Sequence, residues 1–221
     1  GGFAVSKKEL IRRYVFFLLG LFVNSLGISL ITKANLGTSP ISSIPYTLSL
    51  GFPLSLGMFT MIFSMLLMVI QLVILRKRFS KELWLQLPIS LVFSAFIDLT
   101  MAMIFFVNPQ TYATQMLSLL LGCIILGFGV FMEMAANVVM LPGECTVRAI
   151  SSTWNTDFGK TKVAVDVTMA VSAALLGVIL YWQIAGVREG SLISALLVGF
   201  LARLFNRKIG EPVQTLLCDR A

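Results

Sequence analysis

The sequence predicts an all-α membrane protein with six transmembrane helices, arranged as two inverted three-helix repeats. Each repeat has a short re-entrant or broken helix after its first span. Hydrophobic residues make up 57% of the 221 residues and charged residues only 12%, with a mean hydropathy of +0.92. That is more apolar surface than a soluble domain of this length can bury. The second observation is that the two halves of the chain echo each other.

The echo has a constant spacing of 102 residues (142 − 40 = 102 for two prolines) and contains no gaps. Its matches fall mainly on Gly, Pro and Asn, which interrupt or redirect a backbone. They are Leu18-Leu19-Gly20 with Leu120-Leu121-Gly122, Gly27 with Gly129, Ala34-Asn35 with Ala136-Asn137, Pro40 with Pro142, Ser49 with Ser151 and Gly57 with Gly159. Two copies of one membrane unit are typical of secondary transporters. We therefore expect one membrane domain over residues 1–221, with repeat 1 at about 12–107 and repeat 2 at about 114–207.

Six apolar runs approach the roughly 20 residues that a helix needs to cross the hydrocarbon core. They are residues 10–32, 57–75, 83–107, 116–141, 163–182 and 191–205, and the last is the shortest. Because each repeat would hold three spans, an odd number, the second copy must sit inverted in the membrane relative to the first.

The placement of Lys and Arg indicates how these spans are oriented. Basic residues precede the first span, fill the loop between the second and third, and close the sixth, whereas residues 108–115 carry no charge. They are Lys7, Lys8, Arg12 and Arg13, then Arg76, Lys77, Arg78 and Lys81, then Arg203, Arg207 and Lys208. We expect a multi-pass plasma-membrane protein with both termini in the cytoplasm. The net charge of +7 then reflects topology rather than binding of nucleic acid.

Two segments between spans, residues 33–50 and 136–154, are too polar to cross a membrane and too apolar for ordinary loops. In the first, Ser39 and Pro40 predict the start of a short helix, with the Ser39 hydroxyl accepting a free N–H group. Pro45 should bend or end that helix. In the second, Pro142 predicts a helix start with Glu144 in the first turn. Two helix N-termini would then approach the midplane from opposite sides, unless both segments are interfacial loops.

Glu133 is the most costly residue to place in this membrane, because it lies deep in the fourth predicted span. It must face a cavity or a partner, or carry a proton. Asn137 follows one helical turn later and Asn35 is its repeat mate, so a polar cavity at the repeat interface is expected. The residues expected to bind the solute there are Asn24, Asn35, Ser39, Glu133, Asn137 and Glu144.

Structural alternatives exist for these polar groups. The asparagines could form hydrogen bonds between helices, worth about 0.6–2 kcal/mol each. Glu133 could pair with an arginine such as Arg148 or Arg203.

Further charged residues are candidates for ion coupling or gating, together with Glu133: Asp98, Arg148, Asp166 and Arg188. Asp98 has no local partner, so a cation such as Arg148 or Arg188 must reach it, or it must stay protonated. Lys162 and Asp166 have the i, i+4 spacing of an ion pair on one helix face. For Arg188, a loop ion pair with Glu189 is an equal alternative to gating.

The sequence favours neither an enzyme nor a metal or cofactor site. It contains no His, and Cys123, Cys145 and Cys218 are scattered without CxxC spacing. The HExxH and GxSxG motifs do not occur, which leaves an intramembrane protease built on Asp98 and Asp166 as the remaining enzyme alternative. We expect no cofactor, no metal and no nucleic acid. The expected partners are the lipid bilayer and a small-molecule solute, and the sequence leaves a homo-oligomer open.

An ordered set of motifs resembles the YczE/YyaS/YitT family of bacterial integral membrane proteins over nearly the whole chain. The motifs are Ala34-Asn-Leu-Gly-Thr-Ser-Pro40, Gln86-Leu-Pro88 with Asp98, Ala136-Asn-Val-Val-Met-Leu-Pro-Gly143, Phe158-Gly-Lys-Thr-Lys162 with Asp166, and Arg188-Glu-Gly190. Ser191 stands where the family pattern leads us to expect Thr. The resemblance implies a bacterial plasma-membrane location, and it assigns no activity because members are mostly described as membrane proteins of unknown role.

The function that the residues favour is secondary transport of a small polar solute by alternating access, with the site at the midplane between the two short helices. In that reading Glu133 couples solute movement to protons or neutralises a cationic group on the solute. The alternative is a non-transporting accessory or regulatory membrane subunit. A cavity lined by Asn35, Glu133 and Asn137 would favour transport, and a closed midplane with an exposed apolar groove would favour the partner role.

Overall fold

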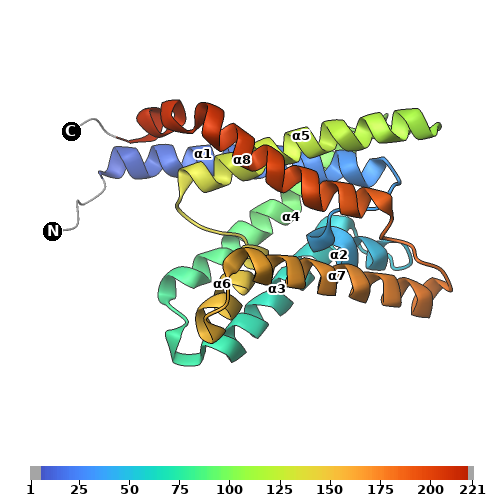
Figure 1. The fold of residues 1–221 in the computed structure, drawn as a ribbon, viewed down its shortest axis with the longest axis horizontal. Helices are drawn as coiled ribbons and strands as arrows, with labels where there is room; N and C mark the ends of the chain where they lie inside the picture. The colour runs from blue at the N-terminus through green and yellow to red at the C-terminus, as the bar shows by residue number, and fades with distance from the viewer. Residues whose placement is uncertain (1–5, 219–221) are drawn as a thin grey trace.

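The computed structural model describes residues 6–218, which fold into helices without a strand (Figure 1). The α-helices are α1 (Lys7–Lys33), α2 (Pro40–Ser49), α3 (Leu56–Leu75), α4 (Gln86–Met103), α5 (Tyr112–Ala136), α6 (Pro142–Trp154), α7 (Phe158–Tyr181) and α8 (Glu189–Leu217). Two short 3₁₀ helices, η1 (Arg76–Arg78) and η2 (Lys81–Leu85), join α3 to α4. The predicted all-helical class is confirmed.

Five stretches are long and apolar enough to cross a membrane: Lys7–Lys33, Leu56–Arg78, Leu83–Met103, Tyr112–Ala136 and Phe158–Tyr181. The remaining long helix, α8, runs over 29 residues and extends well past the predicted span at 191–205. Its apolar stretch is interrupted by Arg203 and Arg207, and it is not among the five. The structure therefore supports a membrane protein with five candidate spans.

Local capping explains where several helices begin and end. Side-chain oxygens accept hydrogen bonds from first-turn N–H groups at the starts of four helices, and they belong to Ser6, Ser55, Thr111 and Asp157.

The fourth predicted span, 116–141, is wrong at its end. Helix α5 stops at Ala136, because Asn137 adopts a left-handed conformation with φ 48°. Asparagine tolerates this conformation and so replaces glycine as a helix terminator.

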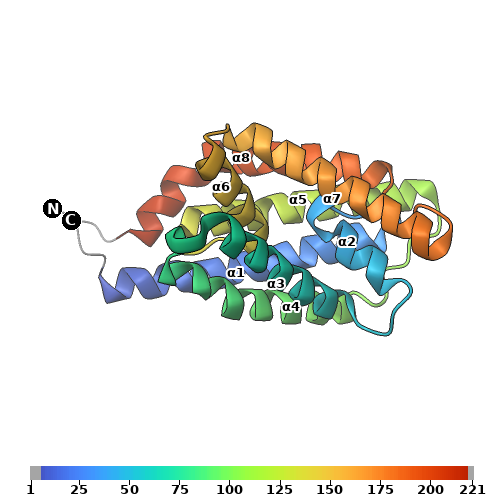
Figure 2. The ribbon, with the colours of Figure 1, turned by 90° about the horizontal axis from the view of Figure 1, so that it is seen from below.

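The helices form two layers that are separated in Figure 1. The upper layer contains α1, α5 and α8, and the lower layer contains α2, α3, α6 and α7. Helix α4 connects them, since it packs on α1 and on α3, and the end of the molecule where α1 begins is also where α8 ends (Figure 2). In the lower layer α2 packs on α3 and α7, and α6 packs on α7 and α3.

The second half does not reproduce every contact of the first. With a spacing of 102 residues, the mate of the pair α3 and α4 is the pair α7 and α8. Helices α3 and α4 pack together, whereas α7 makes its packing contacts with α2 and α6 instead of with α8. Figure 1 shows α7 and α8 diverging from the linker that joins them.

The most extensive packing joins α1 to α5, and it depends on glycines that let the two backbones approach. A Cβ atom at Gly27 would lie 2.5 Å from the Leu126 nitrogen, and one at Gly129 would lie 2.5 Å from the Asn24 nitrogen. The same test places Gly20 against the Gly129 carbonyl and Gly122 against the Gly27 carbonyl. Close approach of this kind is how helices associate in lipid, where burial of apolar side chains provides no driving force.

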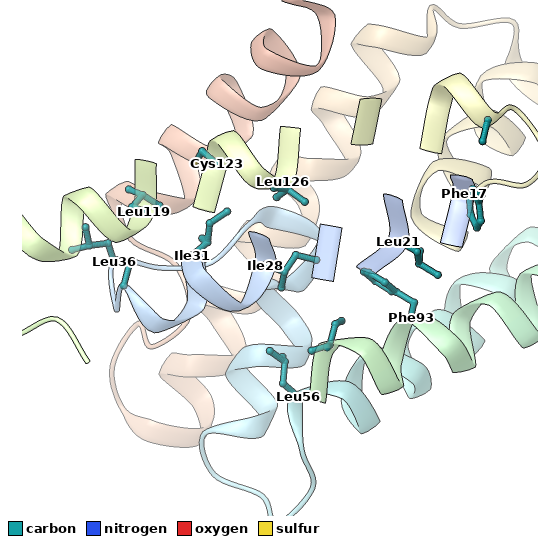
Figure 3. Close-up of a cluster of buried hydrophobic side chains, with 13 residues drawn as sticks. Phe17, Leu21, Ile28, Ile31, Leu36, Leu56, Phe93, Leu119, Cys123 and Leu126 are labelled. Atoms are coloured by element: carbon teal, nitrogen blue, oxygen red, sulfur yellow. The ribbon is translucent and has the colours of Figure 1, made fainter. Parts of the chain in front are cut away.

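A cluster of buried apolar side chains lines the space around this crossing (Figure 3). Phe17, Leu21 and Ile28 of α1 face Phe93 of α4, and Ile31 faces Cys123 and Leu126 of α5. Leu36, in the segment after α1, closes one end of the cluster, and Leu56 reaches it from the start of α3. The core therefore holds α4 and α5 on opposite sides of α1.

We predict that Gly27→Ala and Gly129→Ala each destabilise the protein by about 1–3 kcal/mol, because the new methyl groups must push two backbones apart. Gly199→Ala is the matched control, since a Cβ atom there meets no atom within 4 Å. Thermal unfolding in detergent should therefore show lower melting temperatures for the first two variants only. Equal melting of all three would contradict the proposed packing of α1 and α5.

Candidate functional site

The two short helices begin beside each other in the middle of the lower layer. Helix α2 starts at Pro40 and α6 at Pro142, which confirms both predicted helix starts. A Cβ atom at Gly143 would lie 2.7 Å from Cδ1 of Ile41, so the first turns of the two helices are in contact. Each first turn leaves N–H groups without a helical partner, and the two sets of N–H groups lie close together.

The N-terminus of α2 differs from the prediction in two ways. Ser39 is the N-cap residue, but its side chain makes no cap hydrogen bond, and its buried Oγ has no partner among the described residues. The predicted serine cap is therefore wrong. Pro45 does not end the helix, which continues to Ser49. Because Pro45 has no N–H group to donate to the Ile41 carbonyl, the backbone hydrogen bond that is lost lies in the first turns of the helix.

The N-terminus of α6 differs from that of α2 in its charge. Its N-cap residue is Leu141, which has no polar side chain, and Glu144 provides an acidic group in the first turn. Helix α2 has no acidic residue in its first turn. An acidic group near a helix N-terminus offsets the partial positive charge of the helix, so the two helix starts are electrostatically unequal.

Asn24 and Glu133 form a buried pair between α1 and α5. The Asn24 Nδ2 atom donates a hydrogen bond of 2.9 Å to Oε1 of Glu133, and the two residues are 5% and 7% exposed. Oδ1 of Asn24 is buried without a partner. Within residues 6–218 no Lys or Arg forms an ion pair with Glu133, so the alternative pairing with Arg148 or Arg203 is wrong.

Glu144 links this pair to cations nearer the end of the molecule. The charge that acts on Glu133 is that of Glu144, and the charges that act on Glu144 are those of Lys162 and Arg148. Lys162 lies 3.3 Å from Asp166, which confirms the ion pair predicted from their spacing. A line of charged groups thus leads from the buried Glu133 to exposed residues of α6 and α7.

Asn35 and Asn137 do not join this cluster. Both are exposed, and both have left-handed backbones, with φ 58° and 48°. Asn137 lies one residue past the end of α5, so it no longer shares the helical face of Glu133. Each of the two asparagines lies where the chain leaves a long helix. Their match at the 102-residue spacing is explained by the left-handed turn that both adopt there.

Asp98 caps the start of α3 instead of pairing with an arginine. Its Oδ1 accepts the N–H of Gly57 at 2.9 Å, and its Oδ2 accepts the hydroxyl of Ser55 at 2.8 Å. Of the two expected partners, Arg188 is engaged elsewhere, because it donates to the Asn35 carbonyl and pairs with Glu189, and Arg148 forms no ion pair with Asp98 among the described residues. The expectation of an arginine partner for Asp98 is therefore wrong. Its repeat mate is Phe200, so α8 provides no equivalent cap for the start of α7.

A buried amide network was not expected from the sequence. Gln71 and Gln86 exchange two hydrogen bonds of 3.0 Å between α3 and α4. Gln71 also donates to the Pro142 carbonyl and the Thr146 hydroxyl, both at 3.2 Å. This network fixes the start of α6 against the hairpin of α3 and α4. The sequence did contain a signal for this network, because Gln71 and Gln86 are neutral amides inside predicted spans, and such groups rarely stay unpaired in a membrane.

The opposite end of the molecule has its own polar contacts. Glu189 accepts from Arg188 at 3.0 Å and from the Tyr112 hydroxyl at 3.3 Å. The pKa of Glu189 lies below its ordinary value. The main cause is the hydrogen bond from its own backbone N–H at the start of α8, and Arg188 and Tyr112 lower the pKa further. A pocket of about 370 Å³ lies nearby. It is lined by Thr32, Lys33, Asn35, Tyr46, Met101, Phe105, Val107 and Asn108, and thus includes Asn35 but neither Glu133 nor Asn137.

The acidic groups of the site are too few for a metal ion. Within residues 6–218 there is no group of three His, Cys, Asp or Glu side chains that could hold one. What the arrangement offers is a buried carboxylate, an unpartnered amide oxygen, a second carboxylate and two helix starts. Such a set can bind a polar solute or a proton.

Comparison with known proteins finds one matching family and relatives in Bacillus subtilis. A model described as "Family of unknown function (DUF6198)" matches residues 11–207. The chain is 25% identical to the "Uncharacterized protein YyaS" of Bacillus subtilis (strain 168), over 87% of this chain and 92% of that protein. It is 24% identical to the "Uncharacterized membrane protein YczE" of the same organism, over 89% and 86% of the two chains. These relatives confirm the resemblance that the motifs indicated. No solved structure matches the chain.

We predict that Asp98→Ala destabilises the protein by about 1–2 kcal/mol, because the Gly57 N–H and the Ser55 hydroxyl lose their acceptor. Asp98→Asn keeps one acceptor oxygen and should restore part of the loss. Melting temperatures of the two variants in detergent provide the measurement. An Asp98→Ala protein that melts like the wild type would show that this cap contributes nothing to stability.

Proposed function

Because the chain belongs to the DUF6198 family, whose description assigns no activity, we propose a function from the site itself: secondary transport of a small polar solute by alternating access. The observation that carries the proposal is the contact between the first turns of α2 and α6. Two short helices that start near the midplane from opposite sides form the solute site of several transporter folds. The half-buried Glu144 lies in the first turn of α6, and its charge acts on the buried Glu133 of α5.

An inverted repeat of about 12–107 and 114–207 is part of the proposal, and the glycine contacts support it. Gly20 approaches Gly129, and Gly27 approaches Gly122. Since 20 + 102 = 122 and 27 + 102 = 129, the two contacts exchange when the halves are exchanged. Reciprocal contacts of this kind are the signature of a two-fold axis. The packing of α2 on α7 and of α6 on α3 exchanges in the same way.

The depth of Glu133 follows from this arrangement. The repeat mates Asn24 and Leu126 both lie at the crossing of α1 and α5, so a two-fold axis would pass between them. Glu133 is seven residues beyond Leu126 (133 − 126 = 7), which is about 10 Å along a helix. Because side chains tilt toward the helix N-terminus, its carboxylate points back toward the axis and reaches Asn24. That position suits a solute site near the midplane.

The unequal packing of the two halves is what alternating access requires. In an inverted-repeat transporter the halves adopt different conformations, and exchanging them moves the opening from one side of the membrane to the other. Helices α3 and α4 pack together while α7 and α8 diverge. The basic residues favour a cytoplasmic location for both termini. The ends of α7 and α8 that lie away from their linker, where the two helices diverge, then face the cytoplasm. We assign this conformation to the inward-facing state.

The topology can be tested by labelling single cysteines in a background without Cys123, Cys145 and Cys218. We predict that Ser80→Cys, in the loop between α3 and α4, labels from the cytoplasm. Gln183→Cys, in the loop between α7 and α8, should label from outside. Both positions are exposed, so failure of access is not expected. Labelling of both from the same side would contradict the inverted repeat.

The activity is tested by reconstituting the protein in liposomes and measuring uptake of amino acids, small amines, organic anions and vitamins. We expect saturable flux for one class, and we expect Glu133→Gln to reduce it at least tenfold. The variant should still fold, because glutamine keeps the shape and can accept from Asn24. Glu211→Gln, at an exposed carboxylate of α8, is the matched control that should keep wild-type flux.

Two results would overturn the proposal. One is the absence of saturable flux over the whole panel with folded protein, which would favour an accessory or regulatory subunit. The other is a Glu133→Gln protein that transports like the wild type, which would make Glu133 a tolerated polar residue without a role in the cycle.

A further inference from the structure

The groups around Glu133 are acceptors with too few donors to match them. The Asn24 Nδ2 group donates to Oε1 of Glu133, and no described residue donates to the second carboxylate oxygen. Oδ1 of Asn24 is also unpartnered within residues 6–218, although Asn24 is only 5% exposed. Since a carboxylate can only accept, the donating end of the amide must face Glu133. The unpartnered Oδ1 belongs to the same amide and therefore lies beside that carboxylate.

Glu133 itself also lacks a compensating positive charge. Within the described chain, Glu133 has no Lys or Arg partner, and the charge that acts on it is the like charge of Glu144. Lys162 and Arg148 act on Glu144 and not on Glu133, and Lys162 is already paired with Asp166. A buried carboxylate that is neither ion-paired nor fully hydrogen-bonded is costly in a membrane protein. A ligand that brings both donors and positive charge would remove that cost.

We propose that Asn24 and Glu133, with Glu144, bind the protonated amine group of the transported solute. The proposal rests on the transport function above and specifies the chemical class of its substrate. An ammonium group carries three donors and one charge on a compact centre. The acceptors available to it are the free oxygen of Glu133, Oδ1 of Asn24 and the carboxylate of Glu144, whose charge acts on Glu133. A divalent metal ion fits less well, since it requires about six oxygen ligands.

The test is equilibrium binding to purified protein in detergent, measured by calorimetry. The probes are methylammonium and ethanolamine. Tetramethylammonium is the control that has the charge without N–H donors, sodium tests an alkali ion, and acetate tests an anion. We expect saturable binding of methylammonium and ethanolamine, with at least tenfold weaker binding of the other three.

Variants connect the binding to the named residues. Glu133→Gln removes the charge, and Asn24→Leu removes the free acceptor, so each should weaken methylammonium binding at least tenfold. Ser29→Ala is the matched control, because Ser29 is buried on the same helix but bonds to Thr100 of α4. If Asn24→Leu does not fold, the isosteric Glu133→Gln decides the matter alone.

The proposal is overturned if methylammonium does not bind the folded protein, if sodium or acetate binds equally well, or if Glu133→Gln leaves its affinity unchanged. The flux assay keeps this separate from the transport function. Amine binding without flux would support this site and defeat transport. Flux of an organic anion without amine binding would defeat this site and leave transport standing.

Discussion

The close approach of α1 and α5 is the contact on which the other elements depend. Glycines at the crossing bring the two backbones together, so that a short side chain such as Asn24 can span from one helix to the other and reach Glu133. Helix α4 packs on one side of this pair and α8 on the other, and the lower layer is attached through α4. In lipid such backbone proximity replaces the apolar driving force that holds soluble helices together.

The polar groups inside the protein fall into two kinds. Some are used in structure: Gln71 and Gln86 bond to each other and Gln71 also bonds to the start of α6, while Asp98 accepts hydrogen bonds at the start of α3. Others keep unused hydrogen-bonding capacity among the described residues, namely Asn24, Glu133, Ser39, Ser90 and Ser94. Because unsatisfied groups are expensive away from water, the adjacent pair of Asn24 and Glu133 is the strongest structural argument for a ligand between α1 and α5.

The sequence predicted the helical class, five of the long helices and both short-helix starts, because apolar length and proline position act locally. It could not predict which polar groups meet. Asn35 and Asn137 were expected in the site, yet they end helices. From the sequence, an asparagine that ends a helix in a left-handed conformation cannot be distinguished from an asparagine that binds a ligand. Asp98 was expected to need a cation or to stay protonated, whereas its oxygens accept from Gly57 and Ser55, which only the packing of α3 against α4 brings near.

The fastening by Asp98 has a mechanical consequence, because it exists in one half only. The first half joins its last two helices with a carboxylate cap and a pair of amides, while in the second half Phe200 and Ala173 occupy the positions of Asp98 and Gln71. The first hairpin is therefore the stiffer of the two, and bending will concentrate at the linker between α7 and α8. The two halves of the chain therefore differ in rigidity, with the first hairpin as a rigid frame and the second as a hinge.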